Sequence, residues 1–190
     1  MIYGEHIRLR RNERSDIPKF VEWLNDPEVR RYLLMILPIS QANEEQWFEN
    51  MLKLPGDEQP FGIEIRDIVP EGSNDLWRLI GNCSFMDINR TARSAEVGLF
   101  IGDKSCWNKG YGTEVMHILL RLGFETLNLN RVYLRVDEAN NGGIRAYEKA
   151  GFVHEGRCRQ GIFESGEYRD MLLMSVLRSE WEPEGKTGKR

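Results

Sequence analysis

The stretch Trp107-Asn-Lys-Gly-Tyr-Gly-Thr113 is the most informative feature of the sequence. It separates a strand-like segment, residues 95–102, from a segment with helical apolar spacing, residues 112–126. Its two glycines allow positive φ angles and close approach of the backbone to a ligand. The start of a helix offers unpaired N–H groups and a partial positive charge. A strand, a glycine turn and a helix N-terminus in this order predict a site for a phosphate-sized anion.

Length and composition indicate one folded domain. The 190 residues are 41% hydrophobic and 29% charged, with a net charge of −4. We expect the domain to span residues 1–181 and the polar residues 182–190 to form a flexible tail. The acidic balance weighs against a nucleic-acid partner and is compatible with an amine-bearing substrate.

The sequence shows no pattern typical of a secreted, membrane-spanning, disulfide-linked or metal-binding protein. The N-terminus lacks a basic-then-apolar signal pattern, and no apolar stretch approaches the ~20 residues that span a bilayer. Cys83, Cys106 and Cys158 form neither a metal-ligand pattern nor a disulfide framework. We therefore expect a cytoplasmic protein with no membrane partner and no metal.

Apolar periodicity predicts an α/β (α+β) fold in a single domain. Strands are expected at 2–10, 61–68, 76–87, 95–101, 131–137, 152–158 and 168–177, and helices at 15–24, 27–32, 40–52, 112–126 and 142–150. Residues 69–75 are predicted to be a loop. The order of elements gives a mixed, mostly antiparallel sheet of about seven strands flanked by helices, with one parallel pair around the glycine stretch.

A second group of residues follows the strand at 131–137. Asn140 stands at the expected start of a helix, and Tyr147 lies seven residues later, about two helical turns on. Taken alone, Asn140 could simply cap this helix and Tyr147 could be a core residue. The glycine stretch alone could be a tight turn, since it matches neither a P-loop nor a complete dinucleotide fingerprint.

Together, the two groups resemble motifs A and B of the GNAT acetyltransferases. The glycine stretch through Glu114 matches the first motif, and Asn140 with Ile144-Arg-Ala-Tyr-Glu-Lys-Ala-Gly-Phe152 matches the second. The flanking segments 23–32 and 163–181 resemble the RimJ/RimL-type N-terminal acetyltransferases. This resemblance covers residues 5–181 and implies a GNAT-type domain with acetyl-CoA as the acetyl donor.

The resemblance also implies which residues bind acetyl-CoA. The diphosphate would be bound by backbone N–H groups of the glycine loop, from Asn108, Lys109, Gly110, Tyr111, Gly112 and Thr113. The pantetheine arm would pair with the backbone of the preceding strand, at Leu99, Phe100 and Ile101. The second motif would add Asn140. The sequence departs from the family pattern twice. Trp107 replaces an Arg or Gln, so the loop is expected to act through its backbone. Gly143 replaces a frequent Ser, which is expected to weaken the helix start.

The transfer reaction needs an acid and a base. An attacking amine must lose a proton, and the leaving thiolate benefits from a proton donor. Tyr147 matches the tyrosine that plays the acid role in the family. Glu96, fourteen residues before Gly110, is the candidate base, with an ion pair at the sheet edge as its alternative reading. Glu155, Glu164 and Glu167 could instead lie at the acceptor entrance.

These residues indicate an acetyl-CoA-dependent N-acetyltransferase that transfers an acetyl group directly to a primary amine. The acceptor is left open between protein N-termini and small amines such as polyamines or amine-bearing antibiotics, because the acceptor-binding loops, about 33–50 and 159–168, are variable segments. Two alternatives are a catalytically silent CoA-binding sensor and a nucleotide-phosphate enzyme. An exposed C-terminal strand could pair with a second copy, so a homodimer is an open prediction.

Overall fold

The computed structural model describes residues 1–33, 35, 37–67, 76–164 and 166–182. The predicted loop at 69–75 and residues 183–190 of the predicted tail lie outside the described residues.

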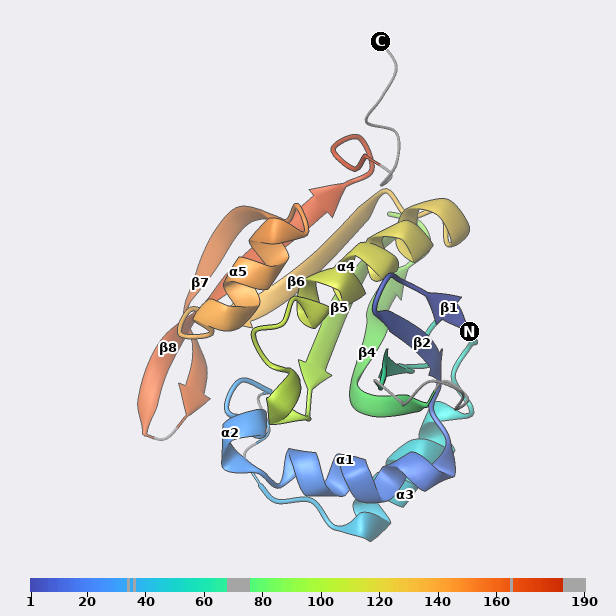
Figure 1. The fold of residues 1–190 in the computed structure, drawn as a ribbon. Coiled ribbons are helices and arrows are strands. Elements are labelled where there is room, and N and C mark those ends of the chain that lie inside the picture. The colour runs from blue at the N-terminus through green and yellow to red at the C-terminus, as the bar shows by residue number, and fades with distance from the viewer. Residues whose placement is uncertain (34, 36, 68–75, 165, 183–190) are drawn as a thin grey trace.

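One mixed sheet organises the described chain (Figure 1). Its eight strands lie side by side in the order β1-β2-β3-β4-β5-β6-β8-β7. Their bounds are β1 Ile2–Tyr3, β2 Ile7–Arg11, β3 Phe61–Arg66, β4 Trp77–Asn89, β5 Ser94–Ile101, β6 Arg131–Asp137, β7 Val153–Glu164 and β8 Glu167–Leu177. Within the described strands, β5 and β6 are the one parallel pair, and all other neighbours are antiparallel. The predicted fold class is therefore confirmed.

Helices cover the sheet in two groups. α4 (Tyr111–Arg121) and α5 (Asn141–Lys149) lie across one face and bury the main core against it. α1 (Ile17–Leu24), α2 (Pro27–Arg30) and α3 (Gln41–Met51) lie at one end of the sheet, below it in Figure 1. Short helical turns η1 (Arg14–Asp16), η2 (Lys104–Cys106) and η3 (Leu122–Thr126) connect these parts. None of the helices described is both long and apolar enough for a membrane crossing.

The predicted first strand is in fact two. Gly4 turns the chain between β1 and β2, where its N–H donates to the carbonyl of Ile7 at 2.8 Å. Glu114 of α4 holds this turn, because one of its carboxylate oxygens accepts the backbone N–H groups of His6 at 2.8 Å and Ile7 at 3.2 Å. A Cβ at position 4 would lie 2.3 Å from that oxygen, so a larger residue there would displace the carboxylate. The hydrogen bonds of Glu114 join residues 108 and 107 positions apart, and strand periodicity alone carries no sign of them.

The C-terminal hairpin is longer than predicted. β7 continues to Glu164 instead of ending near residue 158. Its register shifts between Cys158 and Ile162, where Gln160 adopts φ 51° and donates its N–H to Asp170 at 2.8 Å. A bulge of this kind interrupts the alternation of side chains. The periodic pattern therefore ends before the strand does.

The helix predicted at 112–126 consists of α4 and one wider, π-helical turn, η3. The guanidinium of Arg178, just after β8, donates to the carbonyls of Phe124 and Leu129 beside this turn. It thereby satisfies two backbone acceptors at a helix C-terminal end. The last strand is thus fastened to the end of α4.

We expect Arg178→Ala to destabilise the fold, because two carbonyl groups lose their hydrogen-bond donor. The cost is about 1–2 kcal/mol, which corresponds to a fall in Tm of roughly 2–8 °C for a chain of this size. Thermal unfolding followed by circular dichroism measures it. Exposed Arg159 of β7 serves as the control, and Arg159→Ala should change stability by less than about 0.5 kcal/mol. Equal Tm values for the two variants would contradict this role of Arg178.

Candidate active site

The central feature of the site is the separation of β5 from β6. The two strands pair at Ser94↔Arg131, Ala95↔Val132 and Glu96↔Tyr133 and at no later position. Beyond Glu96, both strands continue, β5 to Ile101 and β6 to Asp137, and Figure 1 shows them diverging toward α2. The second half of β5 therefore has a backbone edge with no strand on the β6 side.

Backbone direction along β5 shows which groups face this open edge. The N–H of Gly102 donates to the carbonyl of Ile80 on β4 at 2.8 Å. Because successive residues of a strand point their polar groups to opposite sides, Ile101 points its groups away from β4. Its carbonyl accepts the indole N–H of Trp107 at 2.8 Å, which agrees with that direction.

The three predicted strand residues are therefore not equivalent. By the same alternation Leu99 also faces the open edge, whereas Phe100 directs its N–H and C=O toward its register partner Asn82 on β4. The carbonyl of Ile101 is already occupied. Leu99 is thus the residue of the three whose backbone is best placed to meet a strand-like ligand.

The glycine loop ends in a helix N-terminus without a side-chain cap. Gly110 is the N-cap residue of α4, in left-handed conformation with φ 87°, and among the described residues no side-chain hydrogen bond caps the first turn. Asn108 is also left-handed, with φ 59°. The N–H groups of Tyr111, Gly112 and Thr113 belong to the first helical turn, where intrahelical acceptors are lacking. With the helix dipole, these donors stand where the sequence predicts an anion site, and the binding of an anion there stays a prediction.

The two glycines of the loop serve different needs. Position 110 favours glycine because its φ is positive. Position 112 does not, since a Cβ there would meet only the Cβ of Ala146 on α5, at an ordinary 3.9 Å.

Tyr147 lies between α5 and the sheet. Its side chain belongs to the main core, 9% exposed, with the ring of Phe152 6.1 Å away. Burial raises the pKa of Tyr147 to about 12. Its hydroxyl has no hydrogen-bond partner in the described part of the chain, so its proton is available to a ligand.

Asn140 caps the helix that carries Tyr147. Its side-chain oxygen accepts the N–H of Gly143 at 2.9 Å. The expectation that Gly143 weakens this helix start stays a prediction, but a Cβ at position 143 would lie 2.7 Å from the Asn140 amide nitrogen. Glycine leaves room for the capping side chain. The contact of Asn140 with acetyl-CoA stays a prediction.

Glu96 is the last residue of β5 that pairs with β6. Its side chain lies on the sheet face opposite the core residues Ala95 and Val97. It is buried, and both carboxylate oxygens accept from the guanidinium of Arg135, at 2.9 and 2.8 Å. The expected ion pair of Glu96 is therefore present, although β5 is an interior strand and not the sheet edge, and the role of Glu96 as a base stays a prediction. Arg135 was not identified from the sequence. The parallel register could have indicated it, because Arg135 lies two residues beyond the partner of Glu96 on the same face of β6.

Of the remaining acidic candidates, Glu167 is exposed at the start of β8, and the other two have partners. Glu155 pairs with Arg131 and accepts the hydroxyl of Ser175 at 2.7 Å, and Glu164 pairs with Arg169. Among the described residues, no cluster of three or more His, Cys, Asp or Glu side chains is arranged to hold a metal ion.

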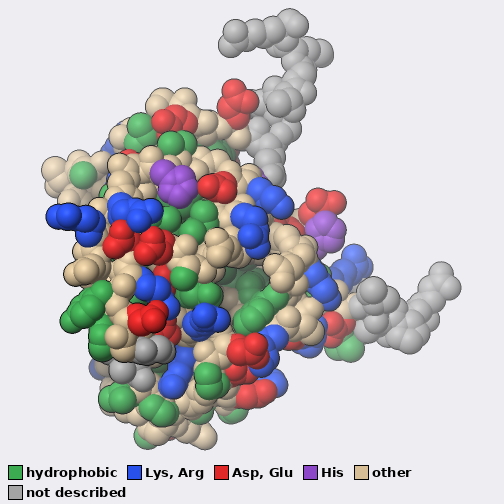
Figure 2. Space-filling model, turned by 90° about the vertical axis from the view of Figure 1, so that its left-hand side faces the viewer, with side chains coloured by type: hydrophobic (Ala, Val, Ile, Leu, Met, Phe, Trp, Pro, Cys, Tyr) green, Lys and Arg blue, Asp and Glu red, His purple; other side chains and the backbone are tan. Residues whose placement is uncertain are grey.

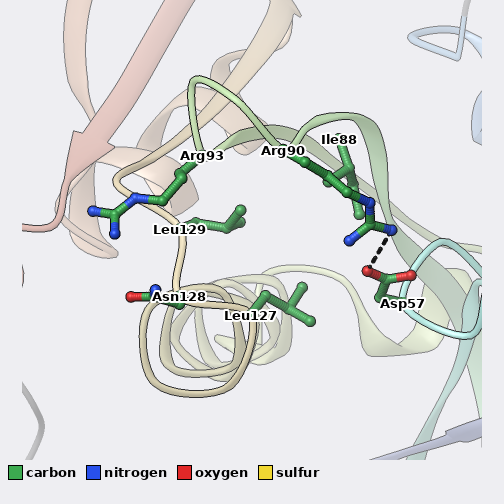
Figure 3. Close-up of a pocket in the computed structure, with 7 residues that line it drawn as sticks. All are labelled: Asp57, Ile88, Arg90, Arg93, Leu127, Asn128 and Leu129. Carbon is green, nitrogen blue, oxygen red and sulfur yellow. Dashed lines mark ion pairs between the residues drawn. The ribbon is translucent and has the colours of Figure 1, made fainter.

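A cavity of about 230 Å³ lies away from these residues (Figure 3). Its lining residues come from the β4–β5 turn, from Asp57 and from the segment after η3: Asp57, Ile88, Arg90, Arg93, Leu127, Asn128 and Leu129. The last three follow the C-terminal end of α4, whereas the glycine loop precedes its N-terminus. The cavity is therefore not part of the candidate site.

We expect Gly110→Ala to lower the free energy of unfolding by about 1 kcal/mol, because alanine is strained at positive φ. Gly156→Ala is the matched control. A Cβ at either position would meet no atom within 4 Å, and Gly156 does not have a positive φ. Urea unfolding measures both variants. If they lose equal stability, the left-handed conformation of Gly110 is not the cause.

Tyr147 should also make stability depend on alkaline pH. An unfolded tyrosine has a pKa of about 10, and that of Tyr147 is about 12. Between these values unfolding releases a proton, so the free energy of unfolding falls as pH rises. Comparing Tyr147→Phe with wild type by urea unfolding, we expect the wild type alone to lose an extra ~2 kcal/mol between about pH 9 and pH 11.5. Parallel pH profiles would show that the phenol is not desolvated. Tyr168→Phe, at an exposed tyrosine, controls for general effects.

Comparison with known proteins gives this geometry a context. The family model described as the acetyltransferase (GNAT) domain matches residues 6–153. "Uncharacterized N-acetyltransferase p20" of Bacillus licheniformis is 29% identical over 182 residues, covering 95% of this chain and 97% of the relative. Spermidine N(1)-acetyltransferase of Vibrio cholerae serotype O1 is 29% identical over 180 residues, covering 94% and 96%.

Solved structures agree with the sequence relatives. The crystal structure of spermidine N-acetyltransferase from Vibrio cholerae in complex with CoA and spermine superposes with a TM-score of 0.80. It is 27% identical and covers 93% of this chain and 98% of its own. With the diverging strands, the uncapped helix behind a glycine loop and the matching family model, the chain belongs to the GNAT family of acetyltransferases.

Proposed function

We propose that this acetyltransferase binds acetyl-CoA between the open edge of β5 and the N-terminus of α4, and transfers the acetyl group directly to a primary amine. The observation that carries the proposal is the junction of two features. The parallel pairing of β5 and β6 ends at Glu96, and the glycine loop that follows β5 leads into a helix start with no side-chain cap.

The residues present fit acetyl-CoA, which supplies the acetyl group as a thioester. Its diphosphate matches the N–H groups of Tyr111, Gly112 and Thr113 and the exposed backbone of Asn108 to Gly110, because several such donors at a helix N-terminus bind anions. Its amide-bearing arm matches the unpaired β5 edge at Leu99. Lys109 adds a positive charge beside the loop. CoA bound to the Vibrio cholerae relative supports this choice of donor.

Tyr147 is the proposed proton-donating residue. Its pKa of about 12 keeps the phenol neutral at any working pH. Complete proton transfer to a thiolate, whose conjugate acid has a pKa of about 8.5, would be uphill by about 5 kcal/mol. Tyr147 therefore acts chiefly by donating a hydrogen bond to the leaving sulfur, which stabilises charge where it develops.

Glu96 lies on the other side of the sheet from Tyr147, at the point where the strands separate. In this position it can receive the amine's proton, directly or through water, while the hydrogen-bond donor acts from the opposite face. Because Arg135 occupies both of its oxygens, Glu96 must share one of them to act as the base.

The charges near the opening favour an acceptor with a single amine, such as a peptide N-terminus. Asp137, on the same face of β6 as Arg135, lies 2.6 Å from Arg169, an ion pair without hydrogen-bond geometry. Arg169 also contacts Glu164. Figure 2 shows cationic and anionic side chains interspersed over the side of the molecule that faces left in Figure 1. A polycation binds most strongly to carboxylates that are not already paired with a cationic side chain. An α-amine is also easier to deprotonate, with a pKa of about 8 against about 10.4 for an alkyl amine.

A polyamine is the second candidate acceptor. It is supported by the names of the relatives, since two of the proteins similar to this chain are spermidine N-acetyltransferases. We retain the prediction of a cytoplasmic location, consistent with three free cysteines. The C-terminal strand β8 is not the exposed edge that the sequence analysis expects, because it lies between β6 and β7. We therefore propose that a second copy pairs along the edge strand β7 instead.

A transfer assay tests the proposal. Acetyl-CoA is supplied with a panel of peptides bearing free N-termini, spermidine and other small amines, and release of free thiol is measured. We expect turnover with at least one amine, and Tyr147→Phe should lower kcat by about 10²-fold while the KM for acetyl-CoA changes little. Tyr3→Phe, at the far edge of the sheet, should have wild-type kinetics.

The other outcomes identify the alternatives. Binding of CoA without turnover on any amine would favour the sensor module. Thermal stabilisation by ATP and not by CoA would favour a nucleotide-phosphate enzyme. Unchanged kcat in Tyr147→Phe would remove this residue from the mechanism, and faster turnover of spermidine than of peptides would select the polyamine acceptor.

A further inference from the structure

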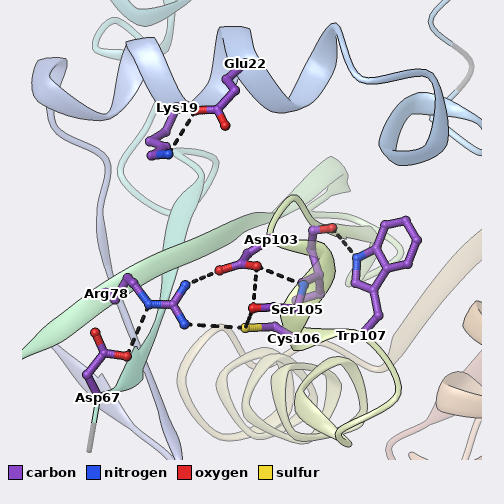
Figure 4. Close-up of polar contacts among 9 residues, drawn as sticks. Lys19, Glu22, Asp67, Arg78, Asp103, Ser105, Cys106 and Trp107 are labelled. Carbon is purple, nitrogen blue, oxygen red and sulfur yellow. Dashed lines mark hydrogen bonds and ion pairs between the residues drawn. The ribbon is translucent and has the colours of Figure 1, made fainter. Parts of the chain in front are cut away.

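The segment that joins β5 to the glycine loop is held at several points (Figure 4). The N–H groups of Gly102 and Asp103 both donate to the carbonyl of Ile80, at 2.8 and 3.1 Å. Asp103 accepts the N–H of Ser105 at 2.9 Å and pairs with Arg78 of β4. Cys106 donates its N–H to the carbonyl of Asp103 at 2.9 Å, and the ammonium group of Lys104 pairs with Asp26 and Glu28 at the start of α2. This segment has one fixed path.

Trp107 is the last fixed residue before the exposed part of the loop. Its indole N–H donates to the carbonyl of Ile101, six residues earlier, at 2.8 Å. Its ring packs in the aromatic cluster of α1 and β5 that includes Phe20, Trp23 and Phe100. The next three residues, 108–110, are exposed, and two of them are left-handed. Trp107 therefore determines where these residues start.

Gly102 shows how closely this arrangement is packed. A Cβ at position 102 would lie 2.1 Å from the ring of Trp23. The backbone between Ile101 and Trp107 lies directly against α1. The hydrogen bond and the ring contacts of Trp107 together tie the glycine loop both to the end of β5 and to the helices at the end of the sheet.

We propose that Trp107 is a positioning residue for the donor: it holds the glycine loop in its anion-binding conformation before the ligand arrives. This inference rests on the proposed function. Residues 108–110 would otherwise have to be ordered on binding, and that ordering reduces affinity. Trp107 contributes no charge to the diphosphate and acts through the backbone of the residues that follow it.

The test compares variants in their affinity for CoA and for pantetheine, which lacks the diphosphate. Trp107→Phe keeps an aromatic ring and removes the N–H donor. We expect the Kd for CoA, measured by calorimetry, and the KM for acetyl-CoA to rise about 3–10-fold, as for the loss of one hydrogen bond. At saturating acetyl-CoA, kcat should change less than about twofold. Inhibition by pantetheine should also be nearly unchanged, because the effect is confined to the diphosphate.

Two further variants separate positioning from general stability. Replacing Trp107 by benzothienylalanine, which has the shape of tryptophan but no N–H, should reproduce the effect of Trp107→Phe even if phenylalanine perturbs packing. Trp181→Phe is the control. Trp181 packs on Phe124, with ring centroids 5.3 Å apart, beyond the other end of α4, and its replacement should leave CoA affinity unchanged.

The outcomes distinguish the two proposals. A wild-type protein that neither binds CoA nor releases thiol overturns the proposed function. If the wild-type protein binds CoA and the benzothienylalanine variant binds it with the same affinity, the proposed role of Trp107 is overturned. Equal loss of affinity for CoA and pantetheine would also overturn it, because it would show a general structural defect.

Discussion

The separation of β5 and β6 after three residue pairs is the constraint from which the rest of the site follows. Two parallel strands that stop pairing leave backbone N–H and C=O groups that need other partners, because unpaired backbone groups are costly to bury. In this protein, some of that need is met internally. The indole N–H of Trp107 donates to the carbonyl of Ile101. At the point of separation, the side chain of Arg135 on β6 also pairs with the carboxylate of Glu96 on β5. The edge at Leu99 is left for a ligand. The opening is thus a stable feature of the sheet.

The loop after β5 converts this opening into a binding site. It turns from the strand into α4 through two left-handed residues, and the helix begins without a side-chain cap. The groups proposed to bind the anion are therefore backbone groups, whose positions depend on how firmly the preceding segment is held. Contacts to Ile80, Arg78 and the α1 cluster provide that support. Since the same aromatic cluster includes side chains of α1, α2 and α3, the glycine loop and the helices at the end of the sheet share one packing unit.

Much of this architecture could be predicted from local patterns. The number and order of the long elements, the single parallel pair and the anion loop follow from apolar periodicity and from glycine spacing. The structure departs from these predictions where a contact between distant residues determines the path of the backbone. The first strand breaks because Glu114 binds the turn at Gly4, and the last hairpin extends through a bulge that Asp170 supports. Gly143 is expected to weaken the helix start of the second motif, yet it makes room for the Asn140 cap.

The sequence by itself determined which residue types are present at the site: left-handed glycine, a helix start free of capping side chains, a tyrosine two turns into the next helix and a glutamate on the strand before. These follow from spacing along one chain, because helices and strands have fixed periods. Only the tertiary structure decided the partners. It buried Tyr147 and so raised its pKa, it paired Glu96 with Arg135, and it directed Trp107 to a carbonyl instead of a phosphate. Such contacts depend on strand register and on packing between distant segments, and no local pattern encodes either.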